Sequence, residues 1–71
     1  MSSWTERYEQ AHRHVIDGQR ITDRQLTLIE RQKLLGSDTT NSEGLLAAFR
    51  RSQAIFESDL ARILQERAQL A

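Results

Sequence analysis

Two histidines, His12 and His14, are the residues of this chain best suited to metal binding or phosphate transfer. They lie in a helix-favouring segment, and helix positions that are two residues apart point to nearly opposite sides. A shared metal ion needs ligands on one side, as an i, i+4 pair would supply. The sequence therefore predicts no metal site and no cofactor. A phosphotransfer or phosphatase accessory bundle that uses His14 is kept as a third hypothesis for the function.

The remaining ionisable residues form no recognisable catalytic motif. Carboxylates alternate with arginines along the chain, and no apolar pocket is apparent around any of them. The chain has neither a glycine-rich phosphate loop nor a nucleophile motif. It also has no cysteine, which excludes disulfides and thiolate metal sites. We therefore expect that the protein is not an enzyme.

Four arginines lie on the side of the first half of the chain that faces away from its apolar residues. Glu9 and Asp17 lie four residues before and after the first of them, so this surface is also interpreted as a solvated face of i, i+4 ion pairs. We favour that interpretation. In the alternative function, an RNA- or DNA-binding hairpin, the guanidinium groups grip phosphates. The four residues are Arg13, Arg20, Arg24 and Arg31.

Length and composition predict one all-α domain over residues 1–71. The 10 Lys and Arg residues balance the 10 Asp and Glu residues, which argues against the strongly basic surface of a nonspecific nucleic-acid binder. Strong helix formers dominate and there is no proline. No apolar run approaches the ~20 residues of a membrane span, and the first ten residues lack the layout of a signal peptide. We expect a cytoplasmic protein that does not contact a membrane.

A single cluster of turn-forming residues, within LLGSDTTNSEGLL (residues 34–46), divides the chain into two helices. Gly36 suits the left-handed residue that ends a helix. Ser3, three residues before a glutamate, fits a capping box at the start of the first helix, and one of residues 38–41 caps the second. The prediction is an antiparallel helical hairpin, with helices at about 3–35 and 41–69 and a turn at 36–41.

An apolar seam follows each predicted helix. In the second helix it has the seven-residue repeat of a coiled coil, interrupted at Gln53 and Arg67. In the first helix the stripe of apolar residues shifts sideways after Val15. The residues assigned to the core or dimer seam are Tyr8, Val15, Ile21, Leu28 and Leu35, followed by Leu46, Phe49, Phe56, Leu60, Ile63 and Leu70.

Folding the chain at the turn predicts which positions face each other. Gly18 falls opposite Leu60, where a missing side chain leaves room for a large one. Gln25 falls opposite Gln53, and these two amides either bond each other and fix the register or point to water. In an alternative fold the first helix breaks at Gly18 and gives a three-helix monomer. A lone glycine costs a helix only ~1 kcal/mol, so the unbroken helix is favoured.

The hairpin is expected to pair with a second copy. Small chains usually need disulfides, a metal or self-association to bury enough surface. Several leucines lie off the seam, and a homodimeric four-helix bundle would cover them. The predicted function is a small non-enzymatic protein–protein interaction or regulatory module. Trp4 is expected in the core at the end of the bundle, and it is also the best single candidate for a contact with a protein partner.

One pattern of residues is shared with other chains: His14-Val15, then Gly18, Ile21 and Gln25, then Gly36, Asp38 and Thr39, then Leu45-Leu46 and Phe49. In this pattern the chain resembles a group of short helical-hairpin proteins from soil and plant-associated bacteria, over about two thirds of its length. The resemblance implies a bacterial origin and a hairpin fold, and it assigns no activity. A plasmid-encoded dimeric hairpin that binds RNA loop pairs and the sporulation aspartyl-phosphate phosphatases are similar in architecture alone. The Ser-x-x-Leu-Asp motif of those phosphatases does not occur in this chain.

Overall fold

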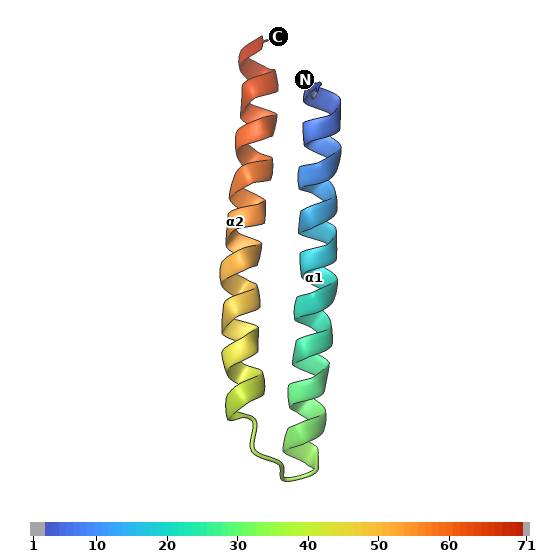
Figure 1. Ribbon diagram of the computed structural model, residues 1–71, viewed down its shortest axis with the longest axis vertical. Coiled ribbons are helices and arrows are strands. Elements are labelled where there is room, and N and C mark those ends of the chain that lie inside the picture. Colours follow the sequence, from blue (N-terminus) through green and yellow to red (C-terminus); the bar gives the residue numbers. More distant parts are fainter. Residues whose placement is uncertain (1–2, 71) are drawn as a thin grey trace.

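The computed structural model describes residues 3–70 as two antiparallel helices joined by a short turn (Figure 1). Helix α1 spans Trp4–Leu34 and helix α2 spans Thr40–Leu70. The predicted all-helical hairpin is confirmed, and each helix boundary lies within one residue of its predicted position. Helix α1 continues through Gly18 without interruption, so the three-helix alternative is wrong. Neither described helix is long and apolar enough to cross a membrane.

The turn depends on a backbone conformation that glycine adopts most readily. Gly36 has a φ of +71°. Its amide donates to the carbonyl of Lys33 at 3.1 Å, and the amide of Ser37 donates to the carbonyl of Gln32 at 2.9 Å. These two bonds form the Schellman pattern, which satisfies carbonyl groups at the end of a helix. The chain therefore leaves α1 in a defined direction and reverses over residues 35–39.

A side chain caps the start of each helix. Ser3 accepts a hydrogen bond from the amide of Glu6 at 3.1 Å, as the capping box predicts. Before α2, Asp38 accepts from the hydroxyl of Thr40 at 2.7 Å and from its amide at 2.9 Å. The bond from the hydroxyl contributes most, and the bond from the amide contributes less, to stabilising the ionised carboxylate. Together they hold the pKa of Asp38 below its ordinary value. Asp38 is thus the member of residues 38–41 that caps α2.

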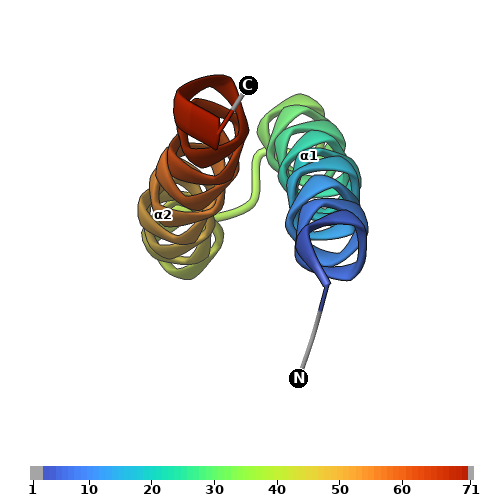
Figure 2. The ribbon, with the colours of Figure 1, turned by 90° about the horizontal axis from the view of Figure 1, so that it is seen from above.

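The hairpin is a thin rod rather than a globule. It measures 54 × 18 × 14 Å, and its radius of gyration is 16.3 Å, against about 11 Å for a compact domain of this length. Seen from the end in Figure 2, the two helices stand as separate columns side by side. A single pair of helices can bury only the side that each turns toward the other.

The core is one seam between α1 and α2. Three residues assigned to it from the sequence alone, Tyr8, Val15 and Leu60, are half-buried. The side chain of Leu70 lies outside the part of the structure that is described. Phe49 and Phe56 are also half-buried. The buried residues are Ala11, Ile29, Leu46 and Ile63, together with the polar residues Gln25, Ser42 and Gln53.

Helix α1 uses a different stripe for this seam from the one predicted. Its buried and half-buried residues continue straight along the helix with a seven-residue repeat, through Ala11, Gly18 and Gln25. The placement of Ile21, Leu28 and Leu35 in the intrachain seam is therefore wrong: in the single hairpin they are 44%, 42% and 76% exposed. The small residues allow a close approach of the two helices, and that approach fixes the helix face that is buried. The contribution of the three exposed residues to a seam between two chains stays a prediction.

The register of the hairpin also differs from the prediction. Gly18 lies against Gln53 and Phe56, not against Leu60. Gln53 Nε2 donates to the carbonyl of Val15 at 2.9 Å, and Gln25 Nε2 donates to the carbonyl of Ser42 at 2.8 Å. Each buried amide is thus bonded to the backbone of the facing helix instead of to the other amide. Such a bond needs close helix packing, and it removes much of the cost of burying a polar group.

We expect Gly18→Ala to lower the free energy of unfolding by up to about 2 kcal/mol. A Cβ at this position would lie 1.7 Å from Gln53 Oε1, so the amide must move away from the carbonyl of Val15. A buried amide left unpaired costs about 1–3 kcal/mol, whereas alanine improves helix propensity by about 1 kcal/mol. Urea unfolding followed by circular dichroism measures the difference.

The control is the same substitution in a Gln53→Ala background. There the new Cβ meets no amide, and alanine is expected to stabilise the helix by about 1 kcal/mol. An effect of the same sign and size in both backgrounds would contradict the proposed coupling between Gly18 and Gln53.

Candidate interaction surface

Two long edges flank the buried seam, and each is built from both helices. One of them we call the Leu28 edge. Its two rows of residues are placed on the same side by the ion pair between Arg7 and Glu66 and by the hollow that Ile21 shares with Ser52. Its members repeat every seven residues along each helix, which keeps them on one side. They are Arg7, His14, Ile21 and Leu28 in α1, Leu35 directly after its end, and Leu45, Ser52, Asp59 and Glu66 in α2.

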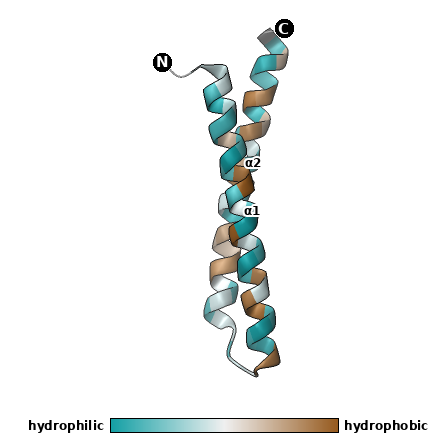
Figure 3. Cartoon of the chain, turned by 90° about the vertical axis from the view of Figure 1, so that its right-hand side faces the viewer, coloured by the Kyte–Doolittle hydropathy of each residue, from teal (hydrophilic) through white to brown (hydrophobic). Residues whose placement is uncertain are grey.

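The half of the Leu28 edge nearest the turn is apolar. In addition to Ile21 and Leu28 on α1 and Leu35 at its end, it includes Leu45 on α2, which is 51% exposed. Figure 3 shows hydrophobic ribbon segments close to the turn. A hollow with a volume of about 210 Å³ lies beside Ile21 between the helices. The other residues that line this hollow are Gly18, Phe49, Ser52 and Phe56.

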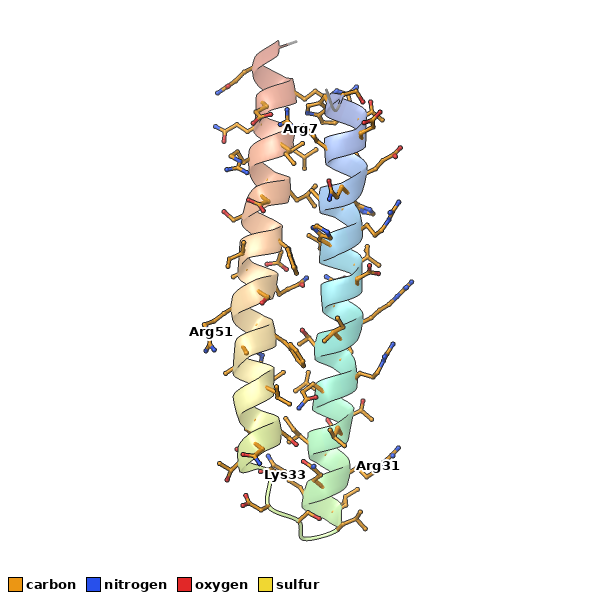
Figure 4. The ribbon with its side chains drawn as sticks, viewed as in Figure 1. Arg7, Arg31, Lys33 and Arg51 are labelled. Atoms are coloured by element: carbon orange, nitrogen blue, oxygen red, sulfur yellow. The ribbon has the colours of Figure 1, made fainter. Side chains whose placement is uncertain are left out.

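The half of the same edge nearest the chain ends is charged. Arg7 on α1 forms an ion pair with Glu66 on α2, and Arg62 pairs with Asp59 at 3.1 Å. In Figure 4 the side chain of Arg7 reaches toward α2 near the open end of the hairpin. The Leu28 edge therefore changes from apolar to charged halfway along the rod.

His14 occupies the charged half of the Leu28 edge. Its ring lies 5.1 Å from the ring of Phe56, and the residue is exposed, as a phosphate-accepting histidine has to be. His12 lies elsewhere and stacks on Tyr8 with the ring centres 5.8 Å apart. Within residues 3–70, no group of three or more His, Cys, Asp or Glu side chains is arranged to hold a metal ion.

The opposite edge, which we call the Lys33 edge, is mostly polar. Lys33 forms a 3.8 Å ion pair with Glu43 across the turn end of the hairpin. The seven-residue spacing places His12, Gln19 and Leu26 on this edge in α1. In α2 it places Arg50, Glu57 and Leu64, which is 47% exposed, so the leucines of this edge are isolated from each other. The edge thus offers a partner no continuous apolar strip.

Four of the arginines of α1, namely Arg13, Arg20, Arg24 and Arg31, are all exposed on its outer side. Figure 4 shows Arg31 pointing away from α2. Among the described residues, the only ion pair that any of the four forms joins Arg20 to Asp17 at 4.0 Å. The expected i, i+4 pairs of Arg13 with Glu9 and Asp17 are not formed.

Trp4 makes its contacts within the hairpin. Its Nε1 donates a hydrogen bond to the carbonyl of Ile63 at 2.9 Å. The guanidinium carbon of Arg67 lies 4.6 Å from the centre of its ring, and the ring of Tyr8 stacks on it at 5.2 Å. The half-buried indole therefore joins the two helices at their open end, where a core position was favoured over a partner contact.

One member of the apolar half, Leu45, was not assigned to the seam, and it was expected only among the leucines off the seam that a second copy would cover. A signal for it was present in the sequence, because Leu45, Ser52, Asp59 and Glu66 repeat every seven residues, as do Arg7, His14, Ile21 and Leu28. The two rows run in opposite directions along the chain, and both change from apolar to charged with distance from the turn.

No protein family, curated protein or solved structure matches the chain. The function is therefore argued from the surface of the hairpin.

We expect Trp4→Phe to lower the free energy of unfolding by about 1 kcal/mol, because it removes the hydrogen bond to Ile63. For a chain of this size that corresponds to a decrease of about 4–8 °C in Tm, measured by circular dichroism at fixed concentration. Tyr8→Phe is the matched control, because it keeps a ring in the stack on Trp4. Equal losses in the two variants would show that the bond to Ile63 is not what stabilises the open end.

Proposed function

We propose that this protein is a small, non-enzymatic interaction module of the cytoplasm, a helical hairpin that self-associates into a four-helix bundle and presents its outer faces to a protein partner. The proposal is carried by one observation: the hairpin exposes more large apolar side chains than it buries. Ala11, Ile29, Leu46 and Ile63 are its buried apolar residues. The exposed large ones are Ile21, Leu28, Leu34, Leu35, Leu45, Ile55 and Leu64.

The total accessible surface supports the same proposal. The chain exposes 5622 Å² for a mass of 8.2 kDa. A compact monomer of that mass exposes about 4,500 Å², so the rod carries an excess of about 1,100 Å². A stable protein–protein interface removes about 800 Å² from each partner. Covering one face by a second copy therefore brings the surface into the range of an ordinary small protein.

We expect the protein to be a dimer of about 16 kDa, twice its mass of 8.2 kDa, in light scattering after gel filtration. Its Tm should rise with protein concentration, because association stabilises the folded state by mass action. Dissociation at lower concentration should also decrease the helical signal. A chain that melts cooperatively as a monomer throughout the micromolar range would exclude self-association.

A second candidate function is binding of RNA or DNA by the arginines on the outer side of α1. The observation that favours it is that Arg13, Arg24 and Arg31 are exposed and form no ion pair within residues 3–70. Guanidinium groups that are free of carboxylate partners can donate hydrogen bonds to phosphates. Because the net charge of the chain is zero, its overall charge does not attract nucleic acid, and such binding depends on this face alone.

If this second function holds, short RNA or DNA duplexes should bind at low salt, and the affinity should fall as salt is raised. Replacing Arg24 and Arg31 by Gln should decrease the slope of log affinity against log salt by about 2, which is one for each lost phosphate contact. The control replaces Arg50 and Arg51 of α2 by Gln; Arg51 points away from α1 in Figure 4. Absence of a complex at low salt, or equal losses in both variants, would exclude the arginine face.

A further inference from the structure

The Leu28 edge has a pattern that fits a second copy of the same chain. Each chain presents two parallel rows of side chains on this edge, one from α1 and one from α2. At the turn end both rows are apolar, with Leu28 on α1 and Leu45 on α2. At the open end, Arg7 on α1 stands beside Glu66 on α2. The two rows are therefore alike in being apolar at the turn end, and they are opposite in charge at the open end.

Two chains that meet face to face on this edge are related by a two-fold axis, and this axis can run in one of two directions. If the two-fold axis runs along the rods, the turns lie at the same end and α1 of one chain faces α2 of the other. Leu28 then meets the partner's Leu45, and Arg7 meets the partner's Glu66. If the axis runs across the rods, α1 faces α1, and full overlap sets Arg7 near the partner's Leu35.

The first arrangement matches the two surfaces at both ends of the rod. It sets leucine against leucine at the turn end, and at the open end it sets His14 beside the partner's Asp59. The second arrangement buries charged groups against leucines, which is costly because a buried charge needs a partner. Sliding the chains until only their apolar halves overlap avoids this cost, but it covers about half of the face.

The area also favours full overlap. The face on which both helices lie side by side measures 54 by 18 Å, or about 1,000 Å². This area is close to the surface excess of the single hairpin and exceeds the roughly 800 Å² that each partner contributes to a standard interface. An overlap limited to the apolar halves would cover about 500 Å² and leave most of the excess exposed.

We infer that the second copy docks on the Leu28 edge about a two-fold axis parallel to the rods, with both turns at one end of the bundle. This inference rests on the proposed self-association and adds its surface and direction. The leucines at the turn end supply affinity, because their burial removes apolar surface from water. The charged pairs at the open end set the direction, as complementary charges at an interface do.

A charge-exchange experiment tests the direction. In Arg7→Glu, positions 7 and 66 are both acidic, and in Glu66→Arg both are basic. Each variant alone should self-associate more weakly than the native chain. An equimolar mixture should form a heterodimer at least about tenfold tighter than either homodimer, because both contacts between the chains are then attractive. Sedimentation equilibrium with one variant fluorescently labelled measures the three affinities.

The matched control uses the ion pair of the opposite edge. Lys33→Glu and Glu43→Lys exchange charges in the same way at a more exposed pair. Mixing these two variants should leave the affinity unchanged, since the Lys33 edge stays in water. Equal rescue in both mixtures, or none for positions 7 and 66, would overturn the proposed docking.

Substitution of single leucines tests the surface. We expect Leu28→Gln to weaken the dimer at least tenfold. Leu34→Gln should not, because Leu34 is 88% exposed and lies off this edge. Monomer circular dichroism spectra should be the same for both variants. A dimer that resists Leu28→Gln would show that the chain self-associates through another face, whereas a native chain that stays monomeric would instead overturn the proposed function.

The overall length gives an independent readout of how far the two chains overlap. In the proposed bundle the longest dimension measured by small-angle X-ray scattering stays close to that of one hairpin, whose Cα atoms span 54 Å. A dimer that overlaps only through its apolar halves would be about half as long again, and that result would contradict the parallel axis.

Discussion

The close approach of the two helices around Gly18 determines which side of each helix is buried. At this point Gln53 enters the space that a side chain would take and donates a hydrogen bond to the carbonyl of Val15. A second bond of the same kind, from Gln25 to the carbonyl of Ser42, lies nearer the turn. Because both amides bond to backbone, the seam accommodates polar residues without leaving either Nε2 donor unpaired. Helix α1 can then bury a stripe of small and polar residues in preference to its leucines.

The exposed leucines are a consequence of that choice. A helix pair buries one side of each helix, and the seam of α1 passes through Ala11, Gly18 and Gln25. The row that contains Ile21, Leu28 and Leu35 is thereby turned to the edge of the rod, where it joins Leu45 of α2. A single hairpin has no further layer of structure that could cover this row. The interaction surface that we propose thus follows from the same contact that holds the two helices together.

Much of the fold could be predicted because its signals are local. Gly36 ends α1 in the left-handed conformation, and Ser3 and Asp38 cap the helix starts, all through bonds to residues close in the chain. The candidate surface was predicted less well. Leu28 was assigned to a seam, but Leu45 was not, and the pairing of Gly18 with Leu60 was wrong. Apolar periodicity identifies every stripe of a helix that is able to pack against another helix. It does not show which of two such stripes on the same helix is buried.

The sequence by itself determined where the helices begin and end, where the chain turns, and that the two helices run antiparallel. Each of these depends on backbone conformations and hydrogen bonds within a few residues. Only the tertiary structure decided the register of the helices and the face of α1 that is buried. Register depends on how closely two surfaces approach, and a small residue such as Gly18 contributes by what it leaves empty. The effect of such a residue on packing can be judged only when the facing residue, here Gln53, is known.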